Sequence, residues 1–153
     1  VANAAKTGDP KAYRLPVPHV DGKYNVSFSG LKTAVLNEVN KAQMKNEEIN
    51  VPDLAASFQE RIAGILAEKL LLAAADTGAK QVCLAGGVAA NSRIRGDFQA
   101  ACDAAGIRLF VPPLKLCGDN AAMIGCQGFY EYQAGHTAGM ELNAYANRDI
   151  SLG

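Results

Sequence analysis

The sequence has no excess of charge of either sign, because 15 lysines and arginines balance 15 aspartates and glutamates. Proteins that bind nucleic acid non-specifically usually carry a net positive field. We therefore expect any RNA partner to be held by a local group of residues or by a part of the protein outside this sequence. The sequence also lacks a long apolar run; the longest, around residues 69–75, is too short to span a membrane.

The sequence has little of what metal centres and hydrolases need, with four cysteines and two histidines. It contains no C-x-x-C pair, no H-x-x-x-H or H-E-x-x-H motif, no phosphate-binding G-x-x-x-x-G-K-[ST] loop and no G-x-S-x-G nucleophile elbow. We expect the cysteines to be reduced packing residues of a cytoplasmic protein. His19 and His136 are expected at the surface. No signal peptide is expected from the first residues, which are small and polar.

Apolar periodicity predicts an alternation of helices and strands. Helices are predicted over 29–44, 52–76, 91–105 and 119–133, and strands over 24–29, 81–85 and 107–111. Helix–strand–helix–strand–helix with short links predicts an α/β fold in which helices cover a sheet containing parallel strands. We predict an extended connector over 1–23, an α/β lobe over 24–135 and a tail over 136–153.

The stretch Lys80–Asn91, KQVCLAGGVAAN, is the centre of the predicted lobe. Its short apolar run predicts a fully buried parallel strand, and Gly86 and Gly87 end that strand. Two residues without Cβ atoms allow the backbone and the next helix N-terminus to approach a phosphate-bearing ligand. Open α/β sheets bind ligands at this edge. The alternative interpretation is a tight strand–helix turn that needs a positive φ.

The second candidate site is CGDN, Cys117–Asn120, between the Pro112–Pro113 stop and the last predicted helix. Asp119 stands where an N-cap belongs, so its carboxylate has a structural explanation. It also stands at the same predicted sheet edge as the two glycines, where a carboxylate could bind a metal or a metal–phosphate complex. No second good ligand is visible in the chain.

Three polar residues follow the Gly-Gly turn. Asn91 is predicted either to cap the next helix or to hydrogen-bond the hydroxyl groups of a ribose, because an amide offers donors and an acceptor. Arg93 and Arg95 in the following turn are predicted to face solvent.

Four stretches in the same order and spacing resemble motifs of the TsaD/Kae family, formerly described as O-sialoglycoprotein endopeptidases or glycoproteases. They are SFSGLKTAV (Ser27–Val35), ASFQERIA (Ala56–Ala63), LAGGVAANSRIR (Leu84–Arg95) and CGDNAAMIG (Cys117–Gly125). This resemblance covers nearly the whole chain. The sequence of the CGDNAAMIG stretch is more similar to that of bacterial members than to that of archaeal ones. The protease label finds no support, because no hydrolytic constellation is present.

The resemblance implies an actin-like ATPase/sugar-kinase (ASKHA) fold with two lobes and a nucleotide between them. It implies transfer of threonylcarbamoyl from threonylcarbamoyl-AMP to N6 of the tRNA adenosine 3′ of the anticodon. Gly86, Gly87 and Asn91 fall on the motif that holds the adenylate or ATP-type nucleotide. Asp119 falls on a ligand of one divalent metal, iron or zinc, which would act as a Lewis acid. Bacterial partners implied are the TsaB and TsaE proteins.

One departure from the family is evident. The other metal ligands of the family are two histidines in an H-x-x-x-H motif on a preceding lobe, and this sequence has no such motif. Together with a first residue, Val1, that is not methionine, this predicts a C-terminal part of a longer protein that is inactive alone. Alternatives from other classes are a non-catalytic interaction subunit of the same complex and a small-molecule kinase of the same fold superfamily.

Overall fold

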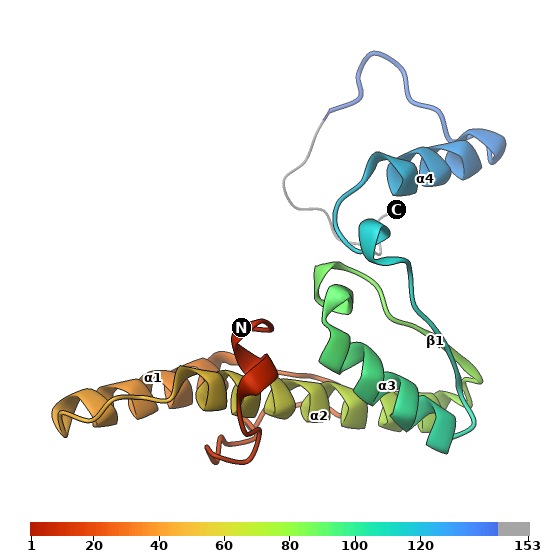
Figure 1. The fold of residues 1–153 in the computed structure, drawn as a ribbon. Helices are drawn as coiled ribbons and strands as arrows, with labels where there is room; N and C mark the ends of the chain where they lie inside the picture. Colours follow the sequence, from red (N-terminus) through yellow and green to blue (C-terminus); the bar gives the residue numbers. More distant parts are fainter. Residues whose placement is uncertain (144–153) are drawn as a thin grey trace. The chain divides into compact units, whose positions relative to one another are not determined.

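The computed structural model describes residues 1–143 and divides the chain into two compact units, 1–118 and 119–153 (Figure 1). The first unit contains η1 (Ala4–Thr7), α1 (Ser29–Met44), α2 (Val51–Thr77), β1 (Gln81–Cys83), η2 (Gly87–Ala90), α3 (Ser92–Ala104), β2 (Arg108–Phe110) and η3 (Leu114–Leu116), and the second contains α4 (Ala121–Gln133). Residues 144–153 of the predicted tail lie outside the described residues. None of the described helices is both long and apolar enough to cross a membrane.

The long helix α2 is the central element of the first unit. Its start is capped by Asn50, whose side-chain oxygen accepts the backbone N–H of Asp53 at 3.1 Å. It ends at Gly78, which adopts the left-handed conformation with φ 67°. One side of α2 contacts the N-terminal segment and another contacts α3 (Figure 1). Helix α2 is therefore covered on more than one side.

The N-terminal segment is fixed along α2 by backbone-to-side-chain hydrogen bonds. The backbone N–H of Asp9 donates to the Asp53 carboxylate at 2.7 Å. The buried hydroxyl of Ser57 accepts the backbone N–H of Tyr13 at 3.0 Å and donates to the Asp9 carbonyl at 3.3 Å. Leu15 is buried two residues later. The segment also contains η1, which its composition did not indicate.

The prediction of a strand over 24–29 is wrong. Residues 25–28 are irregular, and Ser29 already begins α1. The segment is held instead by side-chain contacts to the end of α2, where the Tyr24 hydroxyl donates to Asp76 at 2.6 Å and Lys23 forms an ion pair with Asp76. A short alternating run becomes a strand only when a neighbouring strand offers backbone partners, and here the side chains decide its position.

The two predicted central strands form a parallel pair, which confirms the α/β assignment. The register pairs Gln81 with Arg108, Val82 with Leu109 and Cys83 with Phe110. The core cluster of Ala63, Ile94 and Phe98 lies between α2 and α3, and Leu84 and Leu109 pack against it from the sheet side. This arrangement places hydrophobic packing on one face of the sheet.

The prediction that β1 is fully buried is wrong. Gln81 and Cys83 are exposed and only Val82 between them is half-buried, and β2 repeats this pattern with Phe110 41% exposed. Helices α2 and α3 supply the inner packing, and no described element of the first unit covers the other face. A continuous apolar run therefore indicated a strand correctly but overstated its burial, because burial depends on which elements surround it.

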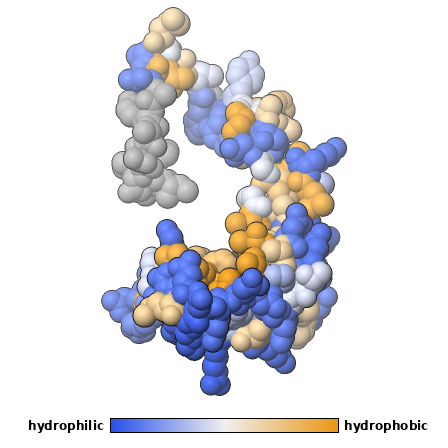
Figure 2. All heavy atoms as spheres, turned by 60° about the vertical axis from the view of Figure 1, so that its left-hand side comes forward, coloured by the Kyte–Doolittle hydropathy of each residue, from blue (hydrophilic) through white to orange (hydrophobic). Residues whose placement is uncertain are grey.

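Apolar side chains of α1 and α4 also remain at the surface. In α1 only Leu31 is buried, while Leu36 is 51% exposed. Helix α4 has no buried residue, and its Phe129 is 56% exposed. An apolar hollow of about 270 Å³ lies between α1 and α2, lined by residues that include Leu54 and Phe58. Figure 2 shows apolar surface residues in groups bordered by hydrophilic ones.

The four cysteines fall into two classes. Cys102 and Cys117 are buried, as expected of packing residues, whereas Cys83 and Cys126 are exposed, so the packing prediction is wrong for these two. Burial raises the pKa of the Cys102 thiol, and the charge of Asp103 adds to this effect. A raised pKa lowers the fraction of reactive thiolate.

We expect two thiols per chain to react promptly with an aromatic disulfide reagent at mildly alkaline pH, and the other two only after unfolding. Absorbance at the wavelength of the released thiolate measures both phases. A double variant in which serine replaces both Cys83 and Cys126 should lack the prompt phase of the reaction. Prompt reaction of all four thiols in the folded chain would contradict the observed burial.

Candidate functional site

The predicted glycine turn has the backbone geometry that requires glycine at its first position. Gly86 has φ 85° and ψ 174°, a region that side chains with a Cβ atom rarely adopt. Its carbonyl accepts the Ala89 N–H at 3.0 Å, the first hydrogen bond of η2. The structure therefore confirms the need for a positive φ at this turn, and it inserts a 3-10 turn before the helix predicted to follow.

Gly87 has no such conformational reason to be glycine. Its φ lies outside the left-handed range, and a Cβ atom built on it would meet no other atom within 4 Å in the described chain. The N–H groups of Gly87 and Val88 also precede the first hydrogen bond of η2. The outer surface of the turn thus presents bare backbone with N–H donors, as a site for a phosphate-bearing group would need.

Asn91 is a helix cap with a second fixed contact. Its side-chain oxygen accepts the N–H groups of Arg93 at 2.9 Å and Ile94 at 3.2 Å, and its amide donates to the Gln59 side chain of α2 at 2.9 Å. The capping alternative is confirmed. Because the oxygen is occupied, Asn91 has one remaining N–H to offer a ligand hydroxyl.

Arg95 connects the loops that follow the two strands. From the first turn of α3, its Nε donates to the carbonyl of Ala89, and its Nη2 donates to the carbonyl of Pro112 at 2.7 Å. The same Nη2 lies 3.0 Å from Sγ of Cys117. The prediction that Arg95 faces solvent is therefore wrong. A planar guanidinium with several donors reaches three acceptors at once, and no local sequence pattern distinguishes it from a surface arginine.

The neighbouring Arg93 behaves differently. It is 41% exposed and forms ion pairs with Asp97, at 2.7 Å, and with Glu60 of α2. Its predicted position at the surface is confirmed. The two arginines of SRIR are thus a surface ion-pairing residue and a loop-connecting residue.

We expect replacement of Arg95 by lysine to destabilise the chain by about 1–3 kcal/mol, because one ammonium cannot satisfy the same buried acceptors in fork geometry. Urea unfolding followed by circular dichroism measures this effect. Hydrogen exchange should also rise at residues 86–90 and 112–117. Arg93→Lys is the matched control and should change stability by at most about 1 kcal/mol. Equal costs for both variants would contradict the connecting role of Arg95.

At the second predicted site, the CGDN loop, the residue that caps the following helix is not the predicted one. Asn120, and not Asp119, is the N-cap of α4, and its side-chain oxygen accepts the Met123 N–H at 3.0 Å. Asp119 is exposed and has no hydrogen-bond or ion-pair partner among the described residues. An asparagine one residue later satisfies the helix end equally well, so the cap alternative for Asp119 is wrong. Asp119 belongs to the second unit, and Gly86, Gly87 and Asn91 belong to the first.

The described residues do not form a metal centre by themselves. No group of three or more His, Cys, Asp or Glu side chains within residues 1–143 is arranged to hold a metal ion. His19 is 95% exposed and His136 is 71% exposed, as predicted for surface histidines. A lone carboxylate gives weak affinity, because tight binding needs several ligands in fixed geometry. Asp119 therefore fits a metal only as one ligand of a larger set.

Comparison with known protein families shows to which family the chain belongs. The family model of TsaD, tRNA N6-adenosine threonylcarbamoyltransferase, matches residues 1–126. The chain belongs to this family. The match includes the Gly86–Asn91 turn and the CGDN loop, so the resemblance inferred from four short motifs is confirmed.

Individual relatives of the TsaD family match the chain over its full length. A tRNA N6-adenosine threonylcarbamoyltransferase of Symbiobacterium thermophilum is 46% identical over 153 residues, which are 100% of this chain and 45% of the relative. Proteins of the same name from Clostridioides difficile and Desulfitobacterium hafniense are 46% and 47% identical, each over 99% of this chain and 45% of the relative. The chain thus spans less than half the length of these relatives.

Proposed function

We propose that this chain is part of an acyltransferase that moves threonylcarbamoyl from threonylcarbamoyl-AMP to N6 of the tRNA adenosine 3′ of the anticodon. The observation that carries this proposal is the family match over residues 1–126, which includes the glycine turn and CGDN. Relatives covering all of this chain are named as tRNA threonylcarbamoyltransferases. The wider fold would be the two-lobed actin-like ATPase/sugar-kinase fold, of which this chain supplies one part.

The glycine turn is the proposed binding site for the adenylate or ATP-type nucleotide. Gly87 leaves room for close approach, since a Cβ atom added there would meet nothing within 4 Å, and the first N–H groups of η2 would donate to a phosphate oxygen. Asn91 would donate its remaining amide hydrogen to a ribose hydroxyl. Arg95 takes no direct part; it is a positioning residue that fixes the turn against the loop after β2.

Asp119 is the proposed contribution of this chain to a site for one divalent metal, iron or zinc. The remaining ligands would come from a part of the protein outside this sequence, because the described residues do not complete the site. The TsaB and TsaE proteins are the proposed partners in the assembled enzyme. On this proposal the isolated chain binds and positions, and the complete active site forms only with the rest of the enzyme.

A chimera tests this function. The 153 residues replace the corresponding segment of the Symbiobacterium thermophilum relative, which is 46% identical over this length. Transfer of threonylcarbamoyl to tRNA is measured by mass spectrometry of the digested nucleosides, with TsaB and TsaE present. We expect transfer by the chimera and none by the isolated chain. A folded chimera that binds its partners but transfers nothing would favour a non-catalytic interaction subunit and overturn the proposal.

A further inference from the structure

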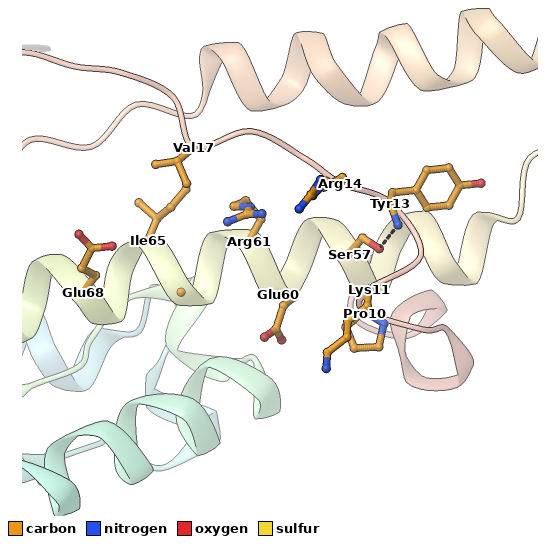
Figure 3. Close-up of a pocket in the computed structure, with 11 residues that line it drawn as sticks. Pro10, Lys11, Tyr13, Arg14, Val17, Ser57, Glu60, Arg61, Ile65 and Glu68 are labelled. Carbon is orange, nitrogen blue, oxygen red and sulfur yellow. Dashed lines mark hydrogen bonds between the residues drawn. The ribbon is translucent and has the colours of Figure 1, made fainter.

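A cleft separate from the glycine turn lies between the N-terminal segment and α2. It has a cavity volume of about 480 Å³, within the range of small-molecule sites. Figure 3 shows its side chains arriving from two directions, from residues 10–17 on one side and from α2 on the other. None of the roles proposed above uses this cleft.

Two arginines from different segments face the same space. Figure 3 shows that Arg14 from the N-terminal segment and Arg61 from α2 both lie between the segment and the helix. Among the described residues, neither guanidinium forms an ion pair with a carboxylate. Two like charges in one cleft repel each other, and an anion placed between them removes that repulsion while it gains forked hydrogen bonds.

The carboxylates of the cleft do not neutralise this pair. Glu60 is directed to the opposite side of α2 (Figure 3), where it forms an ion pair with Arg93 of α3. Glu68 lies beyond Ile65, at the end of the cleft away from Arg14 (Figure 3). The Arg14–Arg61 end of the cleft is therefore locally positive in a chain whose total charge is zero, as a phosphate site needs.

The cleft is also held in place and open. Arg14 lies between two anchored residues, because the Tyr13 N–H donates to Ser57 at 3.0 Å and Leu15 is buried. Gly64, one turn after Arg61, is exposed inside a helix, and a Cβ atom added there would meet nothing within 4 Å. Glycine in the interior of a helix is less stable than alanine. Because a Cβ atom would fit at position 64, packing within the described residues does not explain why this residue is glycine. A bare helix surface beside two cations leaves room for a ligand.

We propose that Arg14 and Arg61 bind a phosphate group in this cleft. A phosphate offers several oxygens to two guanidinium groups at once. The proposed function makes the backbone of the tRNA substrate the expected source, and a free nucleotide phosphate shares the same chemistry. A balanced total charge makes such a local contact more important for RNA binding, because no long-range field assists it.

Binding to the whole 153-residue chain tests the proposal. The probe is a fluorescent anticodon stem-loop RNA, followed by anisotropy, with inorganic phosphate and AMP as competitors. We expect saturable binding whose affinity falls as salt rises. Arg14→Gln and Arg61→Gln should each weaken binding about tenfold, and Glu68→Gln should strengthen it about twofold by removing a repelling charge. Arg108→Gln, which removes a cation outside the cleft, should leave binding within about twofold.

The outcomes separate the phosphate sources and the competing explanations. Competition by AMP at the arginine-dependent site assigns it to a nucleotide phosphate, and its absence assigns it to the RNA backbone. If all three arginine variants weaken RNA binding equally, or if Arg14→Gln and Arg61→Gln have no effect on it, the proposal of a phosphate site in the cleft is overturned. Neither arginine side chain has a structural hydrogen bond in the described chain, so circular dichroism should show unchanged folding. An inactive chimera together with arginine-dependent binding would reject the proposed function and keep this site.

Discussion

Replacing Asp119 with alanine in the chimera is expected to lower threonylcarbamoyl transfer by at least about 100-fold, since even residues that merely support metal ligands cost 10–100-fold when removed. The side chain is exposed and is not needed as a helix cap, because Asn120 fills that position. The substitution therefore removes a carboxylate without disturbing α4. The measurement is the initial rate of modified-nucleoside formation, together with the metal content of the purified protein.

Asp103→Ala provides the control for Asp119, because Asp103 is another exposed carboxylate, and its side chain accepts a hydrogen bond from Gln99 on the same helix. Its activity should stay within about twofold of the unmodified chimera, as for most surface substitutions. Circular dichroism should be unchanged for both variants. Full activity and full metal content after Asp119→Ala would show that the aspartate is not a ligand, even though the family assignment would stand.

Replacing Phe98 with alanine is expected to destabilise the chain by about 3–5 kcal/mol, one of the largest costs that a single substitution causes. Phe98 is 5% exposed and joins α3 to Ala63 of α2, with Leu84 and Leu109 of the sheet region packed around it. Its removal leaves a cavity that two helices and two strands share. Urea unfolding followed by circular dichroism measures the loss.

Two further variants keep the Phe98 result interpretable. Phe98→Leu retains most of the volume and should cost less than about 1.5 kcal/mol, so the loss remains measurable if the alanine variant does not fold. Phe129→Ala removes the same ring from α4, where it is 56% exposed, and should change stability by about 0.5 kcal/mol or less. Equal costs at positions 98 and 129 would contradict the position of the core between α2, α3 and the sheet.

The long elements were predictable because their signals are local. The apolar periodicity of α2 repeats over many turns, Pro52 marks its start and Gly78 its end, and the parallel strands are separated by a single helix of ordinary length. The short segment 24–29 was mispredicted because a brief alternating pattern acquires strand structure only from a partner. Tyr24 finds Asp76 instead, fifty-two residues away, and no local pattern encodes that distance.

The candidate site was predictable to a similar extent. Gly86 needs its positive φ whatever surrounds it, so the turn could be located from Gly-Gly alone. The observed cap of α4 is one residue after the predicted one, because Asp119 and Asn120 are both good capping residues and only the backbone path selects between them. Arg95 could not be found at all, since its acceptors lie on two loops that meet only in the folded chain.

The sequence by itself determined the family, the alternation of helices and parallel strands, and the residues of the glycine turn and CGDN loop, because motifs and periodicity are properties of neighbouring residues. The tertiary structure decided which face of the sheet is covered, that Arg95 holds two loops together, and that Arg14 and Arg61 share one cleft. Each of these depends on atoms brought together from distant parts of the chain, and the sequence of neighbouring residues does not indicate such contacts.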